Sequence, residues 1–208
     1  MTALPALPAI GPDTVWPDRA WDRAHLPAFA DGETLGRLLA HAFSPDSHAA
    51  MGETHAFLAI HKGRIVAERY LGGAFTADST YPSWSMAKSI TQLLTGFLAA
   101  EGKVDIAAPF DAPEWREPGD PRAAITWTHL LRMASGLEFR EDYIDGAVSD
   151  TIEMLFASGK DDMGAYAAAK PLVAPPDTLF NYASGTTNII ARALKGLIGG
   201  GEAGMKAF

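Results

Sequence analysis

Two short apolar runs in the first half of the chain predict a β-hairpin. Residues 56–60 and 64–70 have the apolar character that favours strands, and they flank His61-Lys62-Gly63. The glycine suits a tight turn between two strands. We therefore interpret His61-Lys62-Gly63 as a structural turn.

Apolar residues at helical spacing predict most of the remaining elements. The spacing predicts helices over 34–43, from Ser85 to a break at Gly102, from Thr126 to Gly136, over 151–157, and from Ser184 to the glycines at 199–201. A further helix begins at 202–208, whereas 105–121 is a loop punctuated by proline. With the hairpin, these helices indicate an α/β (α+β) fold.

Composition places the chain among ordinary globular proteins and excludes some chemistry. It has 208 residues, of which 48% are hydrophobic and 20% charged, enough for one domain or two small ones. A formal net charge of −8 without a basic run argues against a nucleic acid partner. The absence of cysteine excludes disulfides and thiolate catalysis.

The N-terminal residues and the histidines exclude further classes. Residues 1–11 are apolar and rich in proline but lack a basic segment, so we predict neither a signal peptide nor a membrane span, and we expect a cytoplasmic protein. The six histidines show no metal-ligand spacing with carboxylates, so we predict no metal and no cofactor. His129, on an apolar helix, is interpreted as a core histidine whose hydrogen bonds are satisfied, and Asp161-Asp162 as a solvated loop.

One lysine stands out on the helix that Ser85 begins. Lys88 is the sole charge there before Glu101, and the apolar and small residues around it predict that most of the helix circumference is buried. A buried ammonium is costly unless it is paired or loses its proton. A neutral amine one turn from a serine hydroxyl, at the positive end of the helix dipole, can activate a nucleophile. A chance pairing of Ser85 and Lys88 is the alternative.

The order of three separated segments gives further information about function. They are Ser85-x-x-Lys88, residues 125–137 (Ile-Thr-Trp-Thr-His-Leu-Leu-Arg-Met-Ala-Ser-Gly-Leu) and residues 180–185 (Phe-Asn-Tyr-Ala-Ser-Gly). Their order and spacing resemble the β-lactamase-related serine hydrolases, which include class C β-lactamases, D-alanyl-D-alanine peptidases, esterases and nylon-oligomer hydrolases. The resemblance runs from about residue 57 to 200. It implies an antiparallel sheet packed with helices, plus a mostly helical domain.

The resemblance also implies catalytic roles. Ser85 corresponds to the family's nucleophile and Lys88 to the lysine that activates it. Tyr182 corresponds to the tyrosine of the Tyr-x-Asn motif, which relays a proton to the leaving group. Ser184 stands where most β-lactamases have asparagine, as in the nylon-oligomer hydrolases. An aromatic that simply packs is the alternative for Tyr182.

Three residues are candidates for substrate binding. Residues 140–145 resemble the segment whose tyrosine contacts the amide in nylon-oligomer hydrolases, which makes Tyr143 a candidate. Ser184 and Trp84, the latter beside the nucleophile, are the other two. Each has a structural alternative, because Tyr143 and Trp84 can pack and Ser184 can bind backbone in a turn.

A late motif of the family is missing from this sequence. Family members take a second oxyanion donor from a strand beside Lys-Thr-Gly or His-x-Gly, and the His-x-Gly found here precedes the nucleophile. We therefore expect a truncated chain. Residues 1–50 would form an N-terminal extension and helix, and residues 51–208 a β-lactamase-related domain without its C-terminal strands.

These observations favour a serine hydrolase that cleaves small esters or amides through an acyl-enzyme on Ser85. The resemblance to the nylon-oligomer hydrolases favours esters and linear amides as substrates. One alternative is a catalytically incomplete fragment that needs a complementing C-terminal chain or self-association. Another is a penicillin-binding type of protein that is acylated without turnover.

Overall fold

The computed structural model describes residues 9–144, 146 and 148–208, which form two compact units, Met1–Pro82 and Ser83–Phe208. Each unit is described by itself. The first eight residues of the predicted extension, and Asp145 of the predicted substrate-contacting segment, lie outside the described residues. The domain boundary at residue 50, which was inferred from the family resemblance, stays a prediction.

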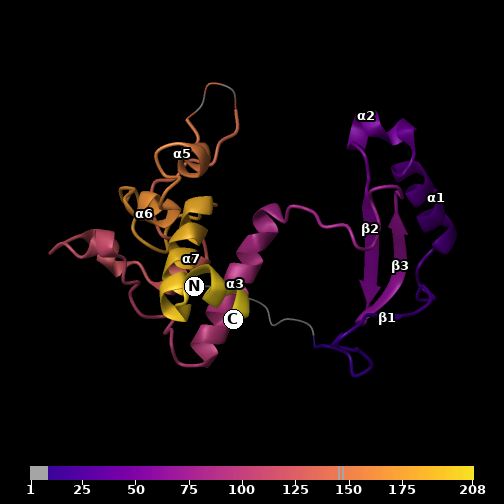
Figure 1. The fold of residues 1–208 in the computed structure, drawn as a ribbon, viewed down its shortest axis with the longest axis horizontal. Coiled ribbons are helices and arrows are strands. Elements are labelled where there is room, and N and C mark those ends of the chain that lie inside the picture. The colour runs from indigo at the N-terminus through magenta and orange to yellow at the C-terminus, as the bar shows by residue number, and fades with distance from the viewer. Residues whose placement is uncertain (1–8, 145, 147) are drawn as a thin grey trace. The chain divides into compact units, whose positions relative to one another are not determined.

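The first unit contains the predicted hairpin. Strands β2 (Ala56–His61) and β3 (Arg64–Tyr70) pair antiparallel, and the two-residue β1 (Asp22–Arg23) adds in parallel to give the order β1-β3-β2 (Figure 1). The helical elements of this unit are α1 (Gly32–Ala42), η1 (Pro45–Ser47) and α2 (His48–Met51). The hairpin and the first helix are thus confirmed.

The geometry of the hairpin turn explains why residue 63 is a glycine. Lys62 and Gly63 have φ angles of 50° and 75°, the left-handed pair that a two-residue turn between twisted strands requires. A Cβ on Gly63 would lie 1.6 Å from the carbonyl oxygen of Val15, whose N–H donates to Lys62. His61-Lys62-Gly63 is therefore a structural turn, as predicted.

The second unit is built from helices around α7. Its elements are η2 (Trp84–Met86), α3 (Ala87–Ala100), η3 (Pro113–Trp115), η4 (Pro121–Ala124), α4 (Trp127–Leu131), α5 (Asp150–Phe156), α6 (Met163–Ala168), α7 (Ser184–Ile198) and α8 (Gly201–Ala207). Helix α7, yellow in Figure 1, contacts α3, α4, α5 and α6. The most deeply buried large side chains belong to one core cluster of this unit: Leu98, Trp115, Ile125, Leu130, Met154 and, on α7 itself, Leu194.

Asp161-Asp162 is exposed and lies outside the helices, as predicted, and the Asp162 carboxylate also accepts the backbone N–H of Ala165 at 2.8 Å. It thereby caps α6, a helix that the apolar spacing does not predict. His129 is half-buried and forms a capping box with Thr126: its Nδ1 accepts the Thr126 N–H at 3.1 Å, and its own N–H donates to Thr126 Oγ1 at 3.2 Å.

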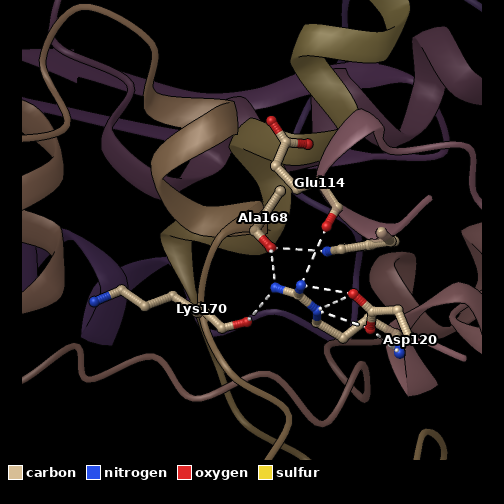
Figure 2. A network of polar contacts seen from close by, with 6 residues as sticks. Glu114, Asp120, Ala168 and Lys170 are labelled. Carbon is tan, nitrogen blue, oxygen red and sulfur yellow. Dashed lines mark hydrogen bonds and ion pairs between the residues drawn. The ribbon is translucent and has the colours of Figure 1, made fainter. Parts of the chain in front are cut away.

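An arginine ties the loop before α4 to the end of α6. The Arg122 guanidinium pairs with Asp120 and also donates to the backbone carbonyls of Glu114, Ala168 and Lys170 at 3.1 to 3.2 Å (Figure 2). Carbonyls at chain turns need donors when they are withdrawn from water. The rigid fork of one guanidinium satisfies three of them together.

A second polar cluster joins the start of α5 to the residues around α6. Asp150 is 7% exposed and accepts hydrogen bonds from Lys170, from the Tyr166 hydroxyl at 2.9 Å and from the Arg140 N–H at 2.7 Å. Burial alone would raise the pKa of Asp150, but these hydrogen bonds together hold its pKa below the usual value. The ionised carboxylate therefore stabilises the folded state.

We expect Asp150→Asn to lower the free energy of unfolding by about 2 to 3 kcal/mol at pH 7. The contribution of the carboxylate is complete above its unfolded pKa of about 3.9 and is lost as pH falls through the lowered folded value. The difference between parent and variant should therefore shrink toward pH 3 in urea unfolding. Asp111→Asn, which breaks an exposed ion pair with Arg116, is the control and should cost under about 1 kcal/mol. Equal losses in the two variants would contradict the prediction.

Candidate active site

Ser85 and Lys88 lie one turn apart where α3 begins. Ser85 belongs to the 3₁₀ turn η2, and Lys88 follows in the first turn of α3. Residues three positions apart on a helix share a face, so the Lys88 Nζ reaches the Ser85 Oγ at 3.1 Å. The pair is therefore fixed by local helix geometry.

The predicted burial of this helix is wrong. Thr95 and Leu98 are the buried residues of α3, while an apolar row along another face is 52 to 70% exposed: Met86, Ile90, Leu93 and Phe97. Lys88 itself is half-buried. Its ammonium is accommodated by polar partners rather than stranded in an apolar core.

The second partner of Lys88 comes from α7. Its Nζ donates to the Ser184 Oγ at 3.0 Å, a contact between residues 96 positions apart. Ser184 is the first residue of α7, and the packing of α7 against α3 places its hydroxyl at Lys88. One amine therefore joins the two hydroxyls of Ser85 and Ser184.

Glu141 holds Ser184 from the opposite side. The Ser184 N–H donates to Glu141 Oε2 at 2.5 Å, and its Oγ–H donates to Oε1 at 2.8 Å. The Tyr143 hydroxyl donates to the same Oε1 at 3.0 Å. A half-buried carboxylate thus gathers three donors beside the nucleophile pair.

Tyr182 contacts Lys88 through the face of its ring. The Lys88 Nζ lies 4.9 Å from the ring centroid, within the range of a cation–π interaction, and the side chain is 43% exposed. Tyr182 therefore lies beside Lys88 with its ring rather than its hydroxyl against the amine.

The other two predicted substrate-binding residues lie at the edge of this cluster. Tyr143 is 66% exposed, and partial burial together with the Glu141 carboxylate raises the pKa of its hydroxyl, so it is a neutral donor at pH 7. Trp84 is 85% exposed with φ of 46°, a left-handed conformation unusual for a bulky residue. Exposure on this scale excludes the alternative that Trp84 packs under the helix.

A pocket opens beside the nucleophile pair. Its volume is about 260 Å³, and its lining combines the hydroxyl, amine and ring described above with an apolar wall: Ser85, Lys88, Ser89, Thr91, Gln92, Leu130, Leu131, Met133, Tyr182, Thr187 and Ile190. Within the described parts of the chain, Ser184, Tyr143 and Trp84 are not among the lining residues. Ser85, Lys88 and Tyr182 thus meet at one concave surface.

The sequence model of the beta-lactamase family matches residues 48–201, which contain all three segments singled out above. The chain belongs to the beta-lactamase family. The family resemblance inferred from the three segments is thereby confirmed. The individual roles of Ser85, Lys88 and Tyr182 remain predictions.

This beta-lactamase-family chain is also similar to a curated protein and to a solved structure. It is 30% identical over 105 residues to the 6-aminohexanoate-dimer hydrolase of Paenarthrobacter ureafaciens, which covers 50% of this chain and 26% of that protein. Its fold matches the structure of a putative 6-aminohexanoate-dimer hydrolase from Bacillus anthracis with a TM-score of 0.61, at 21% identity. That match covers 89% of this chain and 50% of the other. The predicted fold class is confirmed, and the chain spans a quarter to a half of the length of these relatives.

Sequence reasoning missed Glu141. The residue lay within the acidic, aromatic segment 140–145, but Tyr143 was the residue chosen from it. A buried lysine needs a polar or charged partner, so the predicted burial of Lys88 also indicated a nearby carboxylate. Which carboxylate supplies it depends on how α7 packs, because Glu141 reaches Lys88 through Ser184 rather than directly.

Among residues 9–144, 146 and 148–208, no group of three or more histidine, aspartate or glutamate side chains is arranged to hold a metal ion. Over the same residues, no helix is both long and apolar enough to cross a bilayer.

Proposed function

We propose that this protein is a serine hydrolase that cleaves small esters or amides through an acyl-enzyme on Ser85. The observation that carries the proposal is the position of the Lys88 amine, 3.1 Å from the Ser85 hydroxyl and 3.0 Å from the Ser184 hydroxyl. An amine held at this distance can take the proton of a serine as the serine attacks. Membership of the beta-lactamase family supports the same chemistry.

Acylation begins when the Ser85 Oγ attacks the carbonyl carbon of the substrate. Its proton moves to the neutral Nζ of Lys88, and the carbonyl electrons move to the oxygen. The Ser85 N–H lies in the first turn of a helical segment, where backbone donors lack intrahelical partners, so it can donate to this oxyanion. The C–O or C–N bond then breaks, leaving the acyl group on Ser85.

Proton return completes the cycle. The leaving alcohol or amine takes a proton from the Tyr182 hydroxyl, which recovers one from the Lys88 ammonium once the ring has turned its hydroxyl toward the amine. Water then attacks the acyl-enzyme and gives its proton to the neutral Lys88, which passes it to the Ser85 Oγ as the acid leaves. Tyr182 thus serves as a relay in the acylation half of the reaction.

The pocket and the relatives favour a small substrate without a β-lactam ring. A volume of about 260 Å³ lies below the usual range for sites that enclose drug-sized ligands, about 300 to 1,000 Å³. The curated relative is named for hydrolysis of the dimer of 6-aminohexanoate. We therefore propose short-chain esters and linear amides as the substrate class.

The test compares three substrates on the full chain: p-nitrophenyl acetate, the linear dimer of 6-aminohexanoate and benzylpenicillin. We expect release of p-nitrophenol and a transient acetyl adduct on Ser85 by intact-mass analysis. A stable adduct with each substrate and no product would favour a protein that is acylated without turnover. Neither adduct nor product, on protein shown to be folded by circular dichroism, would contradict the proposal and favour an incomplete fragment.

A further inference from the structure

We propose that Glu141 is a positioning residue that acts through Ser184 to keep the free electron pair of Lys88 directed at Ser85. The inference rests on the proposed function and extends it to a residue outside the reacting atoms. The side chain of Glu141 contacts Ser184 and Tyr143, and no hydrogen bond joins it to Ser85 or Lys88 among the residues that the structure describes. Its action must pass through Ser184.

The carboxylate fixes the direction of the Ser184 hydroxyl. An ionised carboxylate has no proton to give, so the contact of 2.8 Å between Ser184 Oγ and Glu141 Oε1 is donated by Ser184. The Ser184 N–H donates to the other carboxylate oxygen at 2.5 Å, which holds the two groups in register. The Ser184 hydroxyl therefore donates its proton to Glu141 and not to Lys88.

This direction determines what Lys88 can do. With its proton turned to Glu141, the Ser184 Oγ presents a lone pair to Lys88 and must accept an N–H of the amine at 3.0 Å. A neutral amine has two N–H groups and one lone pair. With one N–H held by Ser184, the lone pair is left for the Ser85 hydroxyl at 3.1 Å. The proton transfer proposed above requires that the second N–H point elsewhere, so that the order of donation is Ser85 to Lys88 to Ser184 to Glu141.

Other donors and a helix terminus surround the Glu141 carboxylate. The N-cap position of α7 is occupied by Ala183, whose side chain makes no hydrogen bond to the helix. The Glu141 carboxylate accepts the first N–H of the helix, that of Ser184, instead. An anion at this position interacts favourably with the helix dipole. The Tyr143 hydroxyl supplies another donor at 3.0 Å.

Glu141→Gln separates this role from simple packing. Glutamine keeps one oxygen for the Ser184 N–H, but its amide nitrogen then faces the Ser184 Oγ as a donor. The Ser184 hydroxyl must turn away, and its proton points at the lone pair of Lys88. Lys88 is then occupied by Ser184, and the negative charge of Glu141 is gone.

The experiment measures the rate of fluorophosphonate labelling of Ser85 between pH 5 and 10 on the full chain. In Glu141→Gln we expect the maximal rate to fall about tenfold, since one charge-assisted hydrogen bond is lost. We also expect the acid limb of the profile to move about one pH unit lower, since a nearby negative charge is removed. Glu138→Gln is the matched control, because Glu138 pairs with Arg140 at 3.6 Å in the same segment.

Each outcome has a distinct meaning. A parent chain that is not labelled would overturn the proposed function and this inference together. A labelled parent with an acid limb unchanged in Glu141→Gln would overturn this inference alone, because loosened packing lowers the rate without moving the limb. Should Glu141→Gln fail to fold, Ser184→Ala carries the test. It retains the charge of Glu141 and the backbone N–H to it but removes the hydroxyl that joins Glu141 to Lys88. The maximal labelling rate is therefore expected to fall about tenfold, and an unchanged rate would overturn the inference.

Discussion

Replacing Ser85 with alanine is expected to abolish fluorophosphonate labelling and ester turnover while leaving the melting temperature within about 2 °C of the parent. The probe reacts when the Ser85 Oγ attacks phosphorus, fluoride leaves and Lys88 takes the proton. Ser85 is exposed, so removing its hydroxyl leaves no cavity in the core. Intact-mass analysis of the full chain should show one adduct on the parent and none on the variant.

Ser83→Ala is the matched control for this experiment. Ser83 lies two residues before the nucleophile, is exposed, and makes no side-chain capping hydrogen bond to η2. Its replacement should leave the adduct in place. An adduct that persists in Ser85→Ala would assign the reactivity to another residue and contradict the role given to Ser85.

The second large effect is expected from Gly185→Ala, which should lower the free energy of unfolding by about 3 kcal/mol. A Cβ at Gly185 would lie 2.4 Å and 2.6 Å from ring carbons of Phe139 and 2.9 Å from the Cβ of Ala167. Both neighbours are at most 5% exposed, so neither can move into solvent. Urea unfolding monitored by tryptophan fluorescence measures the loss.

Gly196→Ala places the same methyl group on the same helix where nothing lies within 4 Å. It should stabilise the protein by about 1 kcal/mol, because alanine favours a helix over glycine. Gly185→Ala is also expected to slow labelling of Ser85, since the clash displaces the neighbouring Ser184 from Lys88. Equal changes in stability for the two variants would contradict the argument from close packing.

The contact between site residues that are close in the sequence could be predicted, whereas the contacts between distant segments could not. The spacing of Ser85 and Lys88 is set by helix geometry, so a helical pattern sufficed to bring them together. The contact of Lys88 with Ser184 spans 96 positions and was suggested by family resemblance alone. Glu141 was missed because its distance from Ser184 depends on how the segment after Phe139 packs on α7.

The errors in the fold have related physical causes. Periodicity predicts that the apolar face of α3 is buried, because it shows which residues share a face and not what covers that face. Helix α6 was missed because Met163–Ala168 consists mostly of alanine and glycine and carries no apolar stripe. The hairpin was predicted with its correct strands because Gly63 marks a turn whose geometry is local.

The two hydrogen bonds of Lys88 close loops of very different length, three residues to Ser85 and 96 to Ser184. Loop-closure entropy grows with each doubling of length by about 0.6 kcal/mol, so the long loop must be compensated by the packing of α7. The nucleophile pair can form as soon as α3 is helical, while the orientation of its amine waits for α7 to dock. Full reactivity of Ser85 is therefore a property of the folded helical unit as a whole, and its recovery during refolding reports the docking of α7 rather than the formation of α3.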